Sequence, residues 1–457
     1  MNTLLIYLPF TISFLMGYFL LDLILSNEKK LALPIRLFLA GGLGLGLSAH
    51  ITFYSFIIFD RLNTTFVIAI NIFALMYLLT LALIKTKGKI ISLSSFHLHN
   101  FKSAIPYLVI ILLSAPLWYQ THFYAYGGWD AWSTWNLKAK FLFLGEDHWK
   151  NIFDPVLWRS SPHYPLLLPL INVWGWSFSK TAVFGVPVFT AFSFSFMTVG
   201  LLYASLYKAT KSIFPLFAIA VLLTLPYFLK LSYSQYADVI LSYYILASFV
   251  CLTLAKAENN PKLCLVAGIC IGFLSFTKGE GLVAAFVIAL LFIPYMAWKN
   301  KQQNLKKFIA YFFAGAFITA LPTILFQLLY SPQNQTFING LISPTKPATF
   351  YRLKIILSFY LVEFVGQNWN GLWIVLVAGL ICGKGKCFQS KLIIIPLFLL
   401  IYTLIITIYY FLNTHFEIHW WLQVSLHRIM YAVLPLTIFW TFCSLWQDES
   451  SMSDVQS

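Results

Sequence analysis

Charged residues are scarce in this sequence. Of its 457 residues only 10% are Asp, Glu, Lys or Arg, whereas 60% are hydrophobic. A soluble globular domain usually carries about 25% charged residues, so the composition argues against one. Long apolar stretches recur along nearly the whole chain, and each is close to the ~20 residues that a helix needs to cross a bilayer. The composition therefore predicts an integral membrane protein.

Other patterns are missing as well. The segment 32–59 lacks the alternation of a transmembrane β-strand, so helices are the expected way to pair the backbone in lipid. The N-terminal MNTLLIYLPF lacks the basic start and the cleavage site of a signal peptide, which predicts a retained first span. The six cysteines lack the spacing of a zinc site or a disulfide framework. The Lys and Arg residues behind the net charge of +15 are scattered through short loops, so no nucleic-acid partner is expected.

The apolar stretches predict an all-α membrane protein, a polytopic bundle of about 13 transmembrane helices. The candidate spans are 3–25, 32–59, 65–84, 104–119, 182–207, 213–231, 236–255, 262–276, 280–298, 307–330, 366–383, 391–412 and 429–446. All basic loops fall on one side if the short stretch 165–178 does not cross, and cytoplasmic loops are enriched in Lys and Arg. This stretch is then a juxtamembrane or re-entrant helix in the first large outer loop, and the N-terminus lies outside.

Most acidic residues lie on the outer side in this topology. They are found in the segment 120–181, the connection near 232–236, the turn 278–280, the stretch 331–365 and the loop 413–428. Any chemistry is therefore expected on that face.

The densest polar and aromatic cluster is YGGWDAWSTWNLKAKFLF, residues 126–143. Two glycines permit a tight turn, after which Asp130 stands between Trp129 and Trp132 at a point where a helix could begin. Tryptophan faces stack on sugar rings, but tryptophan also anchors helices at the headgroup level. Asp130 is accordingly either a reactive carboxylate or a helix N-cap.

A basic piece and a proline-rich turn follow this cluster. Lys138 lies on a short amphipathic piece, where its ammonium group either meets lipid phosphates or snorkels to the interface. Pro162 and Pro165 bracket His163 and Tyr164, which predicts an extended turn that presents these two side chains.

Four charged residues lie at the outer ends of later spans. Asp238 opens a span and is either a site residue or an N-cap. Lys278 and Glu280 lie in the turn FTKGEGL, where they either bind a ligand or pair with each other. Arg428 comes just before the last span, and its planar guanidinium is suited to a phosphate unless it simply snorkels.

Together these residues resemble the GT-C superfamily of polytopic glycosyltransferases, which includes protein O-mannosyltransferases and aminoarabinose transferases. The matching features are Asp130 in the first large outer loop, the turn Pro162 to Leu167, Asp238 at the start of a later span, the T-K-G-E-G turn from Thr277 to Gly281 and, more weakly, Arg428. The resemblance covers residues 104 to roughly 300 best.

The resemblance implies a sugar donor linked to polyprenyl phosphate and makes Asp130 a general base or a ligand of a divalent cation. The sequence departs from the family pattern in two ways, because Asp130 lacks an adjacent acidic partner and three spans precede the usual first one. The chain is accordingly divided into a three-span extension, a GT-C-like catalytic module, a C-terminal transmembrane module and a cytoplasmic tail, residues 1–103, 104–300, 301–446 and 447–457.

We therefore predict a membrane glycosyltransferase that works on the outer face of a bacterial inner membrane, on a glycan, lipid or protein acceptor. The predicted roles are catalysis for Asp130 and Asp238, donor-phosphate binding for Lys138, Lys278 and Arg428, and substrate contact for Trp129, Trp132, His163, Tyr164 and Glu280. No metal ligand is assigned.

Two other functions compete with this prediction. A secondary transporter or lipid-linked glycan flippase would show matching halves with broken spans, and the sequence shows neither. A polysaccharide polymerase or ligase would also use lipid-linked substrates on the outer face. It differs in whether a single sugar or a preassembled glycan is transferred.

Overall fold

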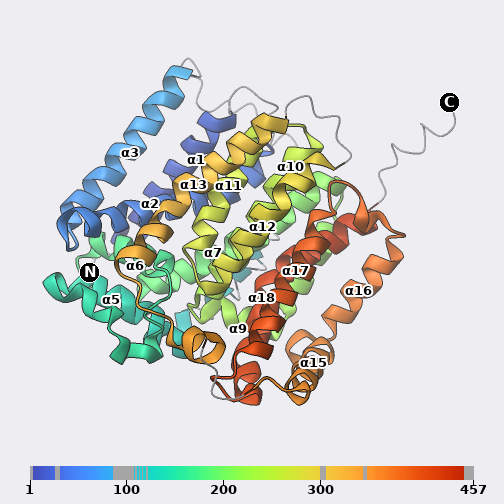
Figure 1. The fold of residues 1–457 in the computed structure, drawn as a ribbon. Helices are drawn as coiled ribbons and strands as arrows, with labels where there is room; N and C mark the ends of the chain where they lie inside the picture. The colour runs from blue at the N-terminus through green and yellow to red at the C-terminus, as the bar shows by residue number, and fades with distance from the viewer. Residues whose placement is uncertain are drawn as a thin grey trace.

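The computed structural model describes residues 4–25, 31–85, 122–298, 305–342 and 347–446, with isolated positions between 108 and 119. All regular secondary structure in these residues is helical, which confirms the predicted all-α class for this part of the chain (Figure 1). Most of the predicted span 104–119 and the whole predicted tail lie outside the described residues.

Nine helices in the described ranges are long and apolar enough to cross a membrane. They are α1 (Leu4–Leu25), α2 (Leu33–Phe59), α3 (Thr64–Lys85), α7 (Gly185–Thr210), α10 (Ala237–Ala257), α12 (Gly279–Ala297), α13 (Leu305–Leu329), α17 (Ile394–Leu412) and α18 (Ile418–Leu445). The chain is therefore a multi-pass integral membrane protein, although the count of about 13 spans is not confirmed.

One predicted span is broken. The stretch 213–231 forms two short helices, α8 (Pro215–Thr224) and α9 (Pro226–Tyr233), whose axes differ by 72°. Pro226 lacks a backbone N–H and disfavours a helical residue before it, and Leu225 is accordingly extended with φ −75° and ψ 121°. The stretch predicted as a span is therefore apolar and helical, but it is bent in its middle.

Two further predicted spans form short helices. The stretch 262–276 contains α11 (Pro261–Ser275), and the stretch 366–383 contains α16 (Leu372–Cys382), of 15 and 11 residues. Neither reaches the ~20 residues of a simple crossing.

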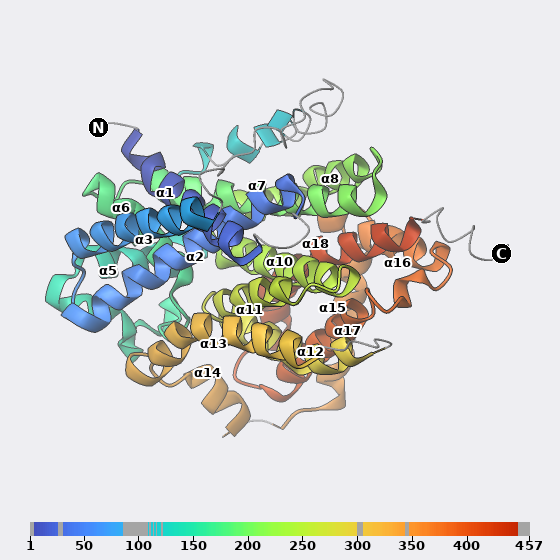
Figure 2. The same cartoon turned by 90° about the horizontal axis from the view of Figure 1, so that it is seen from above.

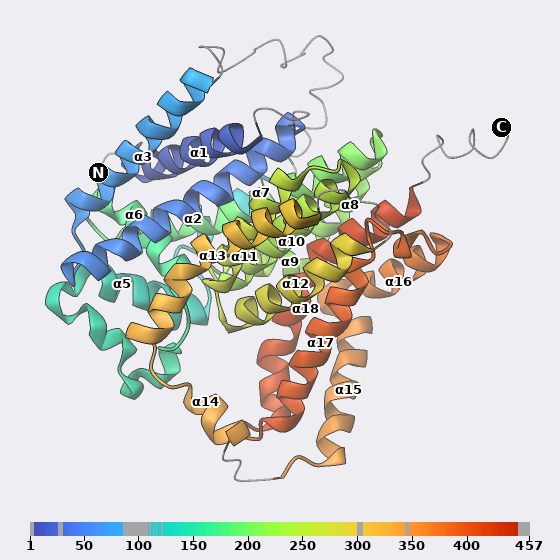
Figure 3. The same cartoon turned by 45° about the horizontal axis from the view of Figure 1, so that its top comes forward.

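The C-terminal part contains more helix than expected. The predicted outer stretch 331–365 contains α14 (Gln335–Phe337) and α15 (Phe350–Val365), and α15 runs beside α17 and α18 (Figure 3). The predicted loop 413–428 is largely helical, because α18 begins at Ile418. The Glu417 carboxylate starts this helix by accepting hydrogen bonds from the backbone N–H groups of His419 and Trp420, at 2.9 and 2.7 Å.

Glycines allow several helices to pack backbone against backbone. A Cβ atom on Gly44 of α2 would lie 1.6 Å from the carbonyl oxygen of Ser13 in α1, and one on Gly268 of α11 would lie 2.1 Å from that of Phe312 in α13. Small residues are the usual means of close helix contact in membranes. Helix α10 lies between α7 and α11 and is almost completely buried (Figure 2).

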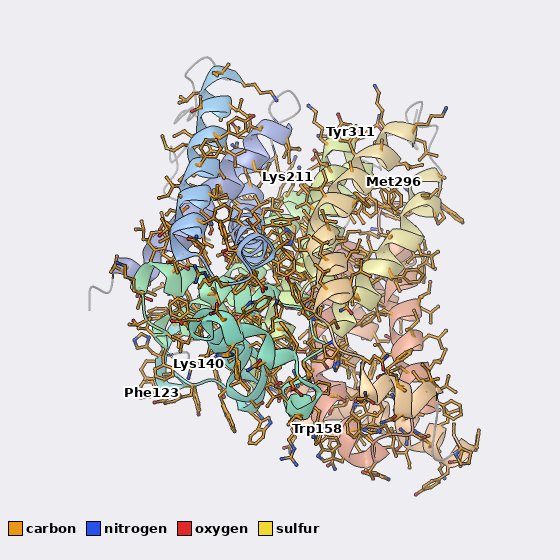
Figure 4. The ribbon with its side chains drawn as sticks, turned by 60° about the vertical axis from the view of Figure 1, so that its left-hand side comes forward. Phe123, Lys140, Trp158, Lys211, Met296 and Tyr311 are labelled. Atoms are coloured by element: carbon orange, nitrogen blue, oxygen red, sulfur yellow. The ribbon has the colours of Figure 1, made fainter. Side chains whose placement is uncertain are left out.

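The segment 131–179 forms a group of short helices at one end of the bundle. They are η2 (Ala131–Trp135), α5 (Asn136–Leu144), η3 (Glu146–Phe153), η4 (Pro155–Ser160) and α6 (Leu167–Ser179). The last of these confirms the short helix expected near 165–178. Phe123, Lys140 and Trp158 lie at this end, whereas Lys211, Met296 and Tyr311 lie at the opposite end (Figure 4).

Candidate active site

A largely buried arginine joins two acidic residues that are far apart in the sequence. Arg428 of α18 donates from Nη1 to Oδ2 of Asp130 at 2.7 Å and from Nη2 to Oδ2 of Asp238 at 2.7 Å. Its Nε also donates to the same oxygen of Asp238, at 3.1 Å. The guanidinium lies 4.7 Å from the ring centre of Tyr236. A planar group with several donors is suited to such bridging.

The second oxygen of Asp238 extends the network. Oδ1 accepts from Lys278 Nζ at 3.1 Å, and Lys278 lies 3.0 Å from Glu280 Oε1. Asp130, Arg428, Asp238, Lys278 and Glu280 therefore form one row of alternating charge, which we call the charge row. With three carboxylates and two cations it carries a formal charge of −1.

The two end residues of the charge row are partly exposed to solvent, whereas its central residue is buried. The side chain of Asp238 is only 1% exposed, whereas those of Asp130 and Glu280 are 30% and 20% exposed. Lys278 and Arg428 lie between these limits, at 6% and 13%. A ligand can therefore reach the two end carboxylates but not the central one.

A glycine turn brings Asp130 to α10. Gly127 has φ +67°, and the N–H of Gly128 donates to the carbonyl of Ser234 at 3.0 Å. A Cβ on Gly128 would lie 2.4 Å from the Tyr236 hydroxyl, which accepts a hydrogen bond from the backbone N–H of Asp130 at 3.3 Å. The turn thus requires glycine and places Asp130 opposite Arg428.

A row of buried amides fixes the same turn. Gln235 donates from Nε2 to the carbonyls of Tyr124 and Ala125, at 3.3 and 3.0 Å, and accepts from Asn136 at 2.8 Å. Asn136 in turn accepts from Asn172 of α6 at 3.0 Å. Sequence reasoning missed these residues because uncharged polar side chains stand out from neither composition nor spacing.

The structure decides several alternatives left open by the sequence. Asp130 occupies the N-cap position of η2 but makes no side-chain capping hydrogen bond, and the N-cap of α10 is Tyr236 rather than Asp238. Arg428 is buried and paired, so it does not snorkel. The ion pair between Lys278 and Glu280 is present, but it is part of the larger charge row. The short η2 helix directly after Asp130 is a π-helix, a form frequent at functional sites.

Two exposed tryptophans lie beside Asp130, at one end of the charge row. Trp129 and Trp132 pack edge to face with ring centres 4.3 Å apart, and both are largely exposed. This leaves their faces available to a sugar ring or to lipid headgroups, so both expectations stand.

The remaining candidate residues lie together around the proline-rich turn. Lys138 is completely buried, and its side-chain nitrogen donates to the carbonyls of Ser161 and Tyr164, at 2.6 and 3.2 Å. Burial lowers the pKa of Lys138 well below its ordinary value. The structure thus gives Lys138 a different environment from the expected membrane surface, and its contacts hold the proline-rich turn in place.

His163 and Tyr164 are held in this turn. The Tyr164 ring stacks on that of buried Trp135 at 5.6 Å, and the His163 ring meets the Tyr164 ring edge-on. Burial, with a smaller effect of Lys138, lowers the pKa of His163 to about 4. Tyr164 also approaches the site, since its ring lies 3.9 Å from the position a Cβ on Gly279 would take.

A metal site is not evident in the described part of the chain, where no group of three or more His, Cys, Asp or Glu side chains is placed to hold an ion. Asp130 and Asp238 are instead paired with Arg428. The divalent cation allowed by the resemblance therefore has no assigned ligands.

The described residues thus form an all-helical membrane bundle with short helices and a charge row at one end. Residues 169–326 match the family described as dolichyl-phosphate-mannose-protein mannosyltransferase. This confirms the predicted resemblance over these residues, and the match indicates a membrane glycosyltransferase of the GT-C type. It includes Asp238, Lys278 and Glu280 but not Asp130 or Arg428. No curated protein and no solved structure matches the chain.

Proposed function

We propose that this protein transfers a sugar from a polyprenyl-phosphate donor to an acceptor on the non-cytoplasmic face of a bacterial inner membrane. The observation that carries the proposal is the charge row, in which an accessible carboxylate, Asp130, lies next to the largely buried cation Arg428. Sugar transfer needs both, a base for the acceptor proton and a cation for the departing phosphate.

The roles follow from the chemistry. Asp130 takes the proton of the acceptor hydroxyl while the acceptor oxygen forms a bond to the anomeric carbon. The bond between that carbon and the phosphate oxygen breaks, and polyprenyl phosphate leaves with the electron pair. Arg428 and Lys278 neutralise the charge that develops on it.

Asp238 has a different role from the catalytic one predicted for it. Its carboxylate is 1% exposed and accepts from both Arg428 and Lys278, so it cannot meet an acceptor hydroxyl. It is a positioning residue that holds the two cations toward the phosphate. The exposed Trp129 and Trp132 are the surfaces proposed for the sugar.

Asp130→Asn tests the proposal. Asn keeps the shape of the side chain but cannot take a proton, so transfer should fall by ~10²–10⁴-fold. Transfer from a polyprenyl-phosphate sugar is measured in membranes at matched expression. Asp60→Asn is the control, because it also removes the carboxylate of an ion pair, here with Lys150, but on an exposed surface. Transfer by Asp130→Asn within about twofold of wild type would remove Asp130 from catalysis.

Transport is the second candidate, favoured by one observation. The bent pair α8 and α9, with axes 72° apart, is similar to the broken spans found in transporters. Transporters place such breaks in matching positions of two halves, whereas the described residues contain one bent pair. Movement of a lipid-linked sugar across liposomes, unaffected by Asp130→Asn, would favour transport over transfer.

A further inference from the structure

The two contacts that Arg428 makes differ in strength and in access. Toward Asp238 it donates twice, and that carboxylate is also held by Lys278 and is closed to solvent. Toward Asp130 it donates once, from Nη1, and that side chain is 30% exposed. One partner of the guanidinium is therefore fixed and the other can be replaced.

We propose that the donor phosphate displaces Asp130 from Arg428, so that donor binding itself releases the base. This inference rests on the proposed function and adds an order of events to it. In the free protein Arg428 occupies Oδ2 of Asp130. The phosphate takes over Nη1, and Asp130 turns to the acceptor hydroxyl.

The exchange is physically reasonable because phosphate and carboxylate compete for the same donor. The donor phosphate is a diester with one negative charge and two non-bridging oxygens, as a carboxylate has, so it can take the same N–H donor, and guanidinium groups suit phosphate oxygens. The cation stays in position during the exchange, since Asp238 keeps its Nε and Nη2. No covalent bond changes and no proton moves until the acceptor arrives.

The exchange has a consequence for catalysis. An acceptor that enters before the donor meets a carboxylate whose Oδ2 is engaged by Arg428. The acceptor hydroxyl is therefore deprotonated only when the sugar donor that it attacks is already bound.

Donor binding by Asp130→Asn tests the exchange. The uncharged Asn side chain competes with the phosphate for Arg428 less well than Asp130 does. A phosphate should therefore bind the variant more tightly than the wild type, by about tenfold or ~1.4 kcal/mol. The probe is farnesyl phosphate, titrated into purified full-length protein in nanodiscs of phosphatidylcholine. Asp60→Asn, the surface control, should bind like wild type. Farnesol, which lacks the phosphate, should bind equally to all three proteins.

A second pair of variants separates exchange from simple repulsion between Asp130 and the phosphate. In an Arg428→Gln background, Asp130→Asn should bring no gain, because the contested donor is gone. A gain that persists there would refute the exchange and leave repulsion as the cause. If Arg428→Gln does not fold, Arg428→Lys replaces it. A single ammonium cannot make all three contacts, so the gain should shrink.

The outcomes also separate this inference from the proposed function. Wild-type protein that binds farnesyl phosphate, with Asp130→Asn binding no more tightly, overturns the exchange and leaves sugar transfer intact. Wild-type protein without saturable binding overturns both. Tighter binding by Asp130→Asn together with loss of transfer supports both, because the residue then opposes donor binding and still serves the chemistry.

Discussion

Asp238→Asn is the sharpest perturbation of the charge row as a structural unit. Asp238 accepts three hydrogen bonds, two from Arg428 and one from Lys278, in a position that is 1% exposed. Asn has the same shape, but its single oxygen can serve only one of the two cations. Its NH₂ group must then face the N–H groups of the other, so donors meet donors.

The expected cost follows from burial. Removing one partner of a buried ion pair costs ~3–5 kcal/mol, because a charge is left uncompensated. In Asp238→Asn, Arg428 is still paired with Asp130 and Lys278 with Glu280. We therefore expect a loss of stability at the lower end of this range, about 3 kcal/mol. The exposed pair of Asp60 and Lys150 sets the scale for comparison, since such pairs contribute ~0.2–1 kcal/mol.

Thermal unfolding of purified protein in matched nanodiscs measures the difference. For a chain of this size, Asp238→Asn should lower Tm by roughly 3–6 °C, and Asp60→Asn should lower it by about 1 °C or less. A Tm for Asp238→Asn within about 1 °C of wild type would show that Asp238 does not hold two buried cations. Arg428 and Lys278 would then not be held together by a shared carboxylate.

Three other predictions concern topology, the amide row and pH. In a variant without native cysteines, intact cells should be labelled from outside at Val156→Cys and not at Lys307→Cys; the reverse pattern would overturn the proposed sidedness. Gln235→Leu should lower kcat for transfer by about tenfold with little change in donor KM, since the lost hydrogen bonds cost ~1–3 kcal/mol and loosen the turn that carries Asp130. Because the folded pKa of His163 is about 4, below the ordinary 6.5, the unfolded state binds more protons between these values. The free energy of unfolding of the wild type should thus be highest above pH 6.5 and fall by ~1–3 kcal/mol toward pH 4. Unfolding of His163→Gln measured at the same pH values should lack this fall.

The members of the charge row could be predicted from the sequence because charge is rare in this chain. Asp130, Asp238, Lys278, Glu280 and Arg428 all stood out as ionisable groups near the outer ends of apolar stretches. Their pairing could not be predicted, since Arg428 joins positions 298 and 190 residues away. Only the packing of α18 against α10 sets that geometry.

The errors in the fold have local physical causes. The break at Pro226 was readable in principle, but a single proline in an apolar run either kinks a helix or ends it, and the neighbouring helices decide which. Helix α18 was expected at 429 because polar residues precede that point, yet the Glu417 cap starts the helix at Ile418. Lys138 was assigned to the surface because burial of a lysine depends on carbonyl groups, here of Ser161 and Tyr164, that the sequence cannot place.

The charge row is a poor device for stability alone. Buried ion pairs often stabilise a protein no better than packed apolar side chains of the same volume, because the charges must leave water. An apolar contact between α10 and α18 would hold these helices together equally well. A purely structural row would also bury its end carboxylates, whereas Asp130 and Glu280 remain partly exposed. Phosphate binding instead requires cations that a buried anion orients toward an accessible end. The arrangement therefore favours a phosphate-binding site over a purely structural contact between helices.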